Sequence, residues 1–120
     1  MAKGALFLGW GTNAVNGREE ATVRVFNESI QYYMQLQQEG QIDSFEPVFL
    51  EPHGGDLGGF ILMKGDRDKL NQIRYSDEFV RLTNRAASVI DNIGIVSAYV
   101  GEEMERFVGN ILPNTQDLIS

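Results

Sequence analysis

The sequence predicts a single α+β domain in the order βαββαβ, with four strands in one antiparallel sheet and both helices on the same face. Three observations lead to this prediction: short apolar runs bounded by glycine or proline, two longer segments with apolar residues at helical spacing, and a length of 120 residues, which suits one domain with its own core. Right-handed crossovers then give the strand order 4-1-3-2. We assign residues 1–101 to this domain and residues 102–120 to a C-terminal extension.

The first strand and the first helix occupy the N-terminal third of the chain. Residues 5–11 form a short apolar run that ends in glycine, which predicts a buried strand. Asn16 is a candidate helix N-cap, with Glu19 three residues later, and apolar residues then recur at helical spacing. Gly40 can adopt the left-handed conformation that ends many helices, so we expect a helix over residues 17–39.

Two more strands, a second helix and a last strand follow. Residues 45–51 predict a strand at the sheet edge, because Pro47 has no amide hydrogen to donate to a neighbouring strand. Residues 57–64 predict the third strand. The second helix is expected to begin after Ser76, which is a suitable N-cap, and residues 93–100 predict the fourth strand.

The two central strands carry apolar side chains on both faces: Leu6, Leu8 and Trp10 against Ala5, Phe7 and Gly9 in one, and Ile61 and Met63 against Phe60 and Leu62 in the other. The helices can cover only one of these faces, and a face that meets water is normally polar. A second copy of the sheet would cover the other face, and self-association of identical surfaces favours twofold symmetry. We therefore predict a homodimer. The extension adds an apolar stripe that we expect to pack on the domain or on the partner: Met104, Phe107, Val108, Ile111 and Leu112.

The chain resembles the dimeric α+β barrel superfamily, whose domains have a ferredoxin-like fold. The resemblance covers residues 5–100 and lies in the element order, in the apolar central strands and in the start of the second helix at Ser76-Asp77-Glu78-Phe79. That superfamily includes cofactor-independent monooxygenases, muconolactone-isomerase-like proteins and many stress-responsive barrels. Because the sequence contains no catalytic motif of a named member, the resemblance implies a shared fold rather than a particular activity.

Composition argues against several classes of partner. Seventeen acidic residues against ten basic ones give a formal net charge of −7, which repels phosphate backbones and anionic lipid headgroups, so we expect neither nucleic acid nor membrane as a partner. The chain has no cysteine and one histidine, and its carboxylates show no ligand spacing, so we expect no metal and no cofactor. The first apolar run is too short to span a membrane and lacks the layout of a signal peptide, which makes a cytoplasmic protein the expectation.

A candidate site lies where the first strand ends and the turn after the second strand begins, because these two strands run parallel and finish at the same edge. His53 is the candidate general base there, with Asp56 to fix its tautomer. Trp10 is a candidate for stacking on a ligand, and Arg18 for binding a carboxylate. Each has a plainer interpretation: an exposed turn, a core tryptophan, or a solvated arginine at a helix start.

These candidates leave two functions open. The first is a cofactor-independent oxygenase or isomerase that acts on a small aromatic or carbonyl compound beside His53, and the titratable ring next to an apolar sheet favours it. The alternative is a non-catalytic dimer that binds or senses a small molecule. The βαββαβ order is also that of RNA-recognition modules, but the acidic charge and the missing basic and aromatic residues argue against that reading.

Overall fold

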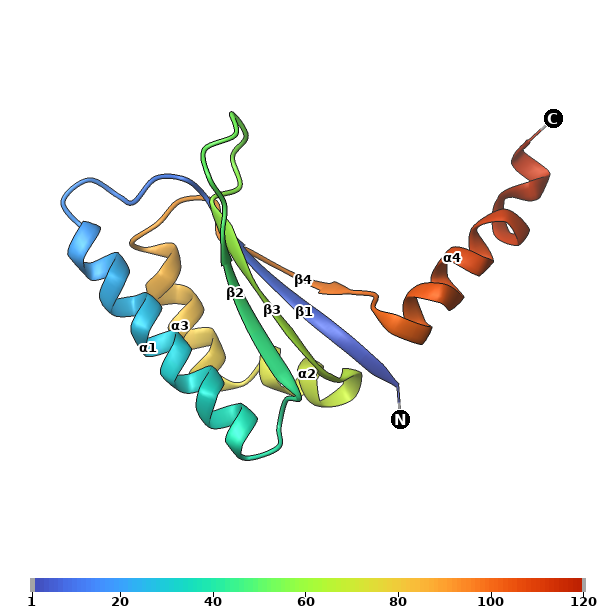
Figure 1. The fold of residues 1–120 in the computed structure, drawn as a ribbon, viewed down its shortest axis with the longest axis horizontal. Coiled ribbons are helices and arrows are strands. Elements are labelled where there is room, and N and C mark those ends of the chain that lie inside the picture. The colour runs from blue at the N-terminus through green and yellow to red at the C-terminus, as the bar shows by residue number, and fades with distance from the viewer. Residues whose placement is uncertain (1, 120) are drawn as a thin grey trace.

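In the computed structural model, which describes residues 2–119, one sheet is covered on one side by a layer of helices, and a further helix projects from its other side (Figure 1). The strands are β1 (Lys3–Trp10), β2 (Ser44–Phe49), β3 (Gly59–Asp66) and β4 (Gly94–Ala98). The helices are α1 (Glu19–Gln38), α2 (Arg67–Arg74), α3 (Asp77–Ala87) and α4 (Gly101–Thr115), followed by a 3₁₀ turn over Gln116–Leu118.

The sheet is antiparallel throughout and has the order β2-β3-β1-β4, which confirms the predicted order read from the other edge. β1 pairs with β3 along its whole length, from Lys3 opposite Asp66 to Trp10 opposite Gly59. β2 lies at one edge of the sheet, as Pro47 predicted, and β4 lies at the other.

The ends of α1 differ in how well they were predicted. The helix begins at Glu19, and Arg18 rather than Asn16 occupies the cap position, without a side-chain cap hydrogen bond. The predicted Asn16 cap was wrong because Gly17, in the left-handed region with a φ of 81°, turns the chain between Asn16 and the helix. At the other end Gly40 is left-handed with a φ of 75°, as predicted, and its amide donates to the Gln37 carbonyl.

The core lies between the sheet and the helices α1 and α3. The sheet residues Leu6, Ile61 and Met63 are at most 2% exposed there, and Phe79 of α3 is 1% exposed. The helix-facing residues of β1 and β3 therefore follow the alternation that the sequence predicted, because directly paired residues such as Leu6 and Met63 project on the same side of the sheet.

The sheet face away from these helices is apolar and half-exposed. Phe7 and Phe60 stack there with ring centroids 5.1 Å apart, beside Leu62 and the 55% exposed Val96. We call these four residues the open face. Within residues 2–119 the helix on this side, α4, contacts β1, but none of its residues is buried.

Helix α4 leaves the sheet on the side of the open face, opposite to α1 and α3 (Figure 1). An ion pair of 3.1 Å between Arg67 and Glu103 and a stack between Tyr99 and Phe107 hold its first turns near the domain, but none of its residues is buried. The radius of gyration is 16.6 Å, compared with about 14 Å for a compact domain of this length. The apolar stripe of α4 is therefore left exposed by the single chain.

In the described part of the chain, no helix is both long enough and apolar enough to cross a membrane.

Candidate functional site

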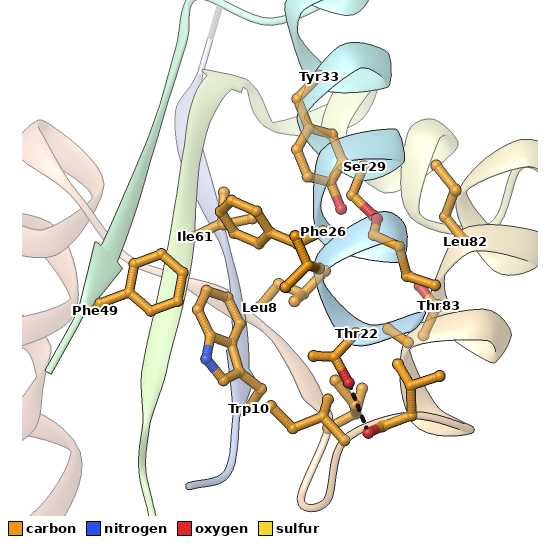
Figure 2. A pocket seen from close by; sticks show the side chains of 16 residues that line it. Leu8, Trp10, Thr22, Phe26, Ser29, Tyr33, Phe49, Ile61, Leu82 and Thr83 are labelled. Carbon is orange, nitrogen blue, oxygen red and sulfur yellow. Dashed lines mark hydrogen bonds between the residues drawn. The ribbon is translucent and has the colours of Figure 1, made fainter. Parts of the chain in front are cut away.

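A cavity of about 280 Å³ lies between the sheet and the helices α1 and α3, at the end where β1 and β2 finish. Figure 2 shows the sixteen side chains that line it: Leu8, Trp10, Thr22, Val23, Val25, Phe26, Ser29, Tyr33, Phe49, Ile61, Leu82, Thr83, Ala86, Val89, Ile90 and Ile93. Ligand pockets in proteins start at roughly 300 Å³, so the size of this cavity suits a compact molecule.

Three aromatic rings form one wall of the cavity. Trp10 from β1, Phe26 from α1 and Phe49 from β2 contact one another, with centroid separations of 6.1, 5.5 and 5.2 Å. Phe49 is 66% exposed whereas Trp10 is 7% exposed, so this aromatic wall extends from the interior to the surface. It offers ring faces and edges on which a flat apolar ligand can pack.

The glycine opposite Trp10 makes room for its ring. A Cβ at Gly59 would lie 2.6 Å from the indole ring and 2.6 Å from the backbone oxygen of Val48. An added Cβ would lie between the indole ring and this backbone oxygen, which cannot move aside as a flexible side chain can. The Trp10 ring would therefore have to shift, so it occupies its position only with a glycine beside it.

We expect Gly59→Ala to lower the free energy of unfolding by about 1–3 kcal/mol, the usual effect of overpacking a well-ordered interior. Gly94→Ala is the matched control, since a Cβ on this glycine of β4 meets nothing within 4 Å. Urea denaturation followed by circular dichroism measures both. Equal midpoints for the two variants would contradict the tight contact between Gly59 and Trp10.

The lining is uncharged, and its polar groups are mainly hydroxyls. None of the sixteen residues is acidic, basic or a histidine. Three of the hydroxyls donate hydrogen bonds of 2.8–3.0 Å to backbone carbonyls: Thr22 to Val89, Ser29 to Val25 and Thr83 to Phe79. Their protons are therefore already used inside the protein, and their oxygens remain as acceptors.

Tyr33 is the fourth hydroxyl of the lining. It is 2% exposed, and this burial raises the pKa of its phenol above the ordinary value, while the neighbouring Ser29 hydroxyl opposes that shift. Tyr33 is therefore a neutral phenol throughout the physiological pH range.

His53 and Asp56 lie in the loop between β2 and β3, and neither lines the cavity. The Nε2 atom of His53 is 2.8 Å from the carbonyl oxygen of Leu57, and its Nδ1 atom accepts a hydrogen bond of 3.2 Å from the Gly55 amide. In the structure the backbone of the loop thus engages both ring nitrogens, and the pairing of His53 with Asp56 stays a prediction. The role of His53 as a general base stays a prediction.

The two predicted ligand-binding residues lie apart. Trp10 lines the cavity, whereas the guanidinium of Arg18 donates a hydrogen bond of 2.6 Å to the Ser88 carbonyl and so ties the start of α1 to the end of α3. That bond leaves Arg18 outside the lining. Ligand contact by either residue stays a prediction. Among the described residues, no three histidine or carboxylate side chains come together as metal ligands would.

Sequence reasoning missed the hydroxyls of α1. Thr22, Ser29 and Tyr33 follow one another at intervals of seven and four residues, so they share a helix face. Val25 and Leu36, both buried, lie on the same face. The available signal for these residues was the presence of hydroxyl side chains inside an otherwise apolar helical stripe. The sheet edge, from which the candidate site was predicted, did not indicate them.

Comparisons with known proteins inform the fold. The sequence matches no protein-family model and no curated protein. Among solved structures, the chain is similar to a dimeric protein of unknown function with a ferredoxin-like fold from Bacteroides fragilis, with a TM-score of 0.60 and 13% sequence identity over 82% of this chain and 96% of that one. At this identity the match shows the fold alone, and it confirms the ferredoxin-like fold predicted from the sequence.

Proposed function

We propose that the protein is a homodimer in which each protomer binds a compact, uncharged small molecule in the cavity between the sheet and helices α1 and α3. The observation that carries this proposal is the uncharged, aromatic lining of the cavity. A charged ligand would give up its hydration there without meeting an opposite charge, which is strongly unfavourable. A flat apolar ligand would instead gain burial and ring contacts at the aromatic wall.

Binding without catalysis accounts for the cavity better than a cofactor-independent oxygenase or isomerase does. Such an enzyme needs a group that moves a proton at the substrate, with a pKa near the working pH. The lining contains no histidine or carboxylate, and the raised pKa of Tyr33 makes its phenol a poor general base near neutral pH. We therefore favour the non-catalytic alternative of the two functions that the sequence left open.

The homodimer is supported by two apolar surfaces on the same side of the sheet. The open face covers the middle of the sheet, and α4 carries the stripe of residues that are 46–68% exposed: Met104, Phe107, Val108, Ile111 and Leu112. Because α4 projects from the side of the open face, one partner can contact both surfaces (Figure 1). The similar protein from Bacteroides fragilis is itself dimeric. We infer that the apolar stripe of the C-terminal extension packs on the partner rather than on its own domain.

The binding proposal can be tested with one matched pair of probes, naphthalene and naphthoate, which share a ring system and differ in charge. Trp10 is the only tryptophan and lines the cavity, so its fluorescence reports on occupancy. We expect saturable quenching by naphthalene and binding of naphthoate that is weaker by roughly tenfold or more, because the carboxylate would be desolvated without a partner. Calorimetry gives the two affinities independently. Naphthoate binding as tightly as naphthalene would overturn the uncharged site.

A further inference from the structure

We propose that two copies of the chain pack with their open faces together and with the twofold axis parallel to the strands, so that Val48 of each protomer enters a hollow at Gly94 of the other. This docking rests on the homodimer of the proposed function and specifies how its two sheets meet. It is independent of what the cavity between the sheet and the helices binds.

The strand pairing determines which side chains are neighbours on the side of the sheet that carries the open face. Directly paired residues project to the same side, so each row can be followed across the sheet from β2 to β4. The middle row consists of Glu46, Leu62, Phe7 and Val96, and the row nearer the end of β1 consists of Val48, Phe60, Gly9 and Gly94. In this second row, β2 and β3 supply both large side chains, and β1 and β4 supply both glycines.

The two glycines lie at a hollow of about 250 Å³, whose walls include Phe7, Leu57 and Val96. A Cβ on Gly94 would meet nothing within 4 Å, so the side chains of the single chain leave this space unfilled. Val48 and Phe60 occupy the other half of the same row. The surface therefore carries a projection and a hollow at the same level, on opposite halves of the sheet.

An axis that runs along the strands, between β1 and β3, brings the projection and the hollow together. It sets β2 against the partner's β4 and β3 against the partner's β1, and it keeps each row at its own level. Val48 then faces the partner's Gly94, and Phe60 faces the partner's Gly9. Side chains of two packed sheets interdigitate at the density of a protein interior, so this arrangement fills both hollows of the dimer.

The other face-to-face arrangement has its axis across the strands and sets every strand against its own copy. Val48 is then directed at the partner's β2, and the hollow meets only β1 and β4 of the partner. With this axis through the middle row, Glu46 also faces the partner's Glu46, and such a meeting of like charges is unfavourable. The axis along the strands instead sets Glu46 against the partner's β4, whose residues Gly94–Ala98 carry no charge. Shape and charge thus favour the same axis.

Two single-cysteine variants test the contact directly. The chain has no cysteine of its own, so Val48→Cys and Gly94→Cys each introduce the only thiol. In one chain the two positions lie at opposite edges of the sheet, three strand spacings or roughly 14 Å apart. After the protomers have exchanged, a short bismaleimide is expected to cross-link the mixture of the two variants into a covalent dimer, and to leave either variant alone largely uncross-linked on denaturing electrophoresis.

A pair of size changes tests the same contact without a reagent. Gly94→Val has room in the single chain but would meet the partner's Val48, so the dissociation constant of the dimer is expected to rise by roughly tenfold or more. Adding Val48→Ala to the same chain makes room and should return the constant close to the wild-type value, although the two residues cannot touch within one protomer. Sedimentation velocity measures the constant, and circular dichroism checks the fold.

The outcomes separate this docking from the proposed function. If the wild type is a dimer, a mixture that does not cross-link would overturn the docking, and so would effects of Gly94→Val and Val48→Ala that simply multiply. The homodimer and the ligand cavity would then stand. A monomeric wild type would overturn the homodimer together with this docking, and would leave ligand binding to be decided by the fluorescence of Trp10.

Discussion

Val96→Asp is expected to convert the proposed homodimer into a monomer that keeps its fold. Val96 lies on β4 directly opposite Phe7 and is 55% exposed in the single chain, so an aspartate there remains hydrated in a monomer. In a dimer that covers the open face, the carboxylate would be buried against apolar side chains in both protomers. An uncompensated buried charge costs several kcal/mol, so the dissociation constant is expected to rise by roughly a hundredfold or more.

Sedimentation velocity at micromolar concentration measures this change, and circular dichroism checks the fold. Val80→Asp is the matched control, because Val80 is a 42% exposed valine on α3, on the opposite side of the sheet. It should leave the dimer intact. Leu112→Asp in α4 should weaken the dimer in the same direction as Val96→Asp. A Val96→Asp protein that is still dimeric would exclude the open face as the interface, and a monomeric wild type would remove the homodimer altogether.

Ala86→Phe is expected to abolish saturable binding in the cavity. Ala86 lines the cavity from α3 and is half-buried, so a phenyl group there would occupy space that the ligand needs. The added ring fills an existing void rather than a packed region, so the free energy of unfolding should change by less than the roughly 1–3 kcal/mol that overpacking a filled core costs. Quenching of Trp10 fluorescence by naphthalene measures the binding, and thermal denaturation measures the stability.

The control for this prediction is the next residue. Ala87→Phe adds the same side chain to an exposed position of α3 that does not line the cavity, and it should bind naphthalene like the wild type. Undiminished binding by Ala86→Phe would place the ligand somewhere other than this cavity, with the loop that carries His53 as the next region to examine.

The elements and their order could be predicted because they depend on short-range periodicity. Alternation in β1 separates Leu6 and Leu8 from Phe7, and the structure has these residues on the two faces that the alternation predicted. Pro47 likewise predicted an edge strand, because proline lacks the backbone amide hydrogen that a residue in a central strand donates to its neighbour. Such signals act within a few residues, so they can be read before any tertiary contact is known.

The candidate site could be predicted only in part. Trp10 was predicted as a ligand-contacting residue and lines the cavity. The sequence also predicted that His53 pairs with Asp56. In the structure, the imidazole instead contacts the Leu57 carbonyl and accepts a hydrogen bond from the Gly55 amide of the same loop. Local backbone turns of this kind, like the one at Gly17, depend on φ and ψ values that the residue types in a loop do not specify.

The amino-acid sequence by itself determined the α+β class and the two-sided apolar character of the central strands, since both follow from periodicity within single elements. It also determined the strand order, through the order of the elements and the right-handed rule for crossovers. Only the tertiary structure decided where the cavity lies and which hydroxyls face it. A cavity is the volume that side chains from β1, β2, α1 and α3 leave unfilled, so it depends on the distances between segments far apart in the chain.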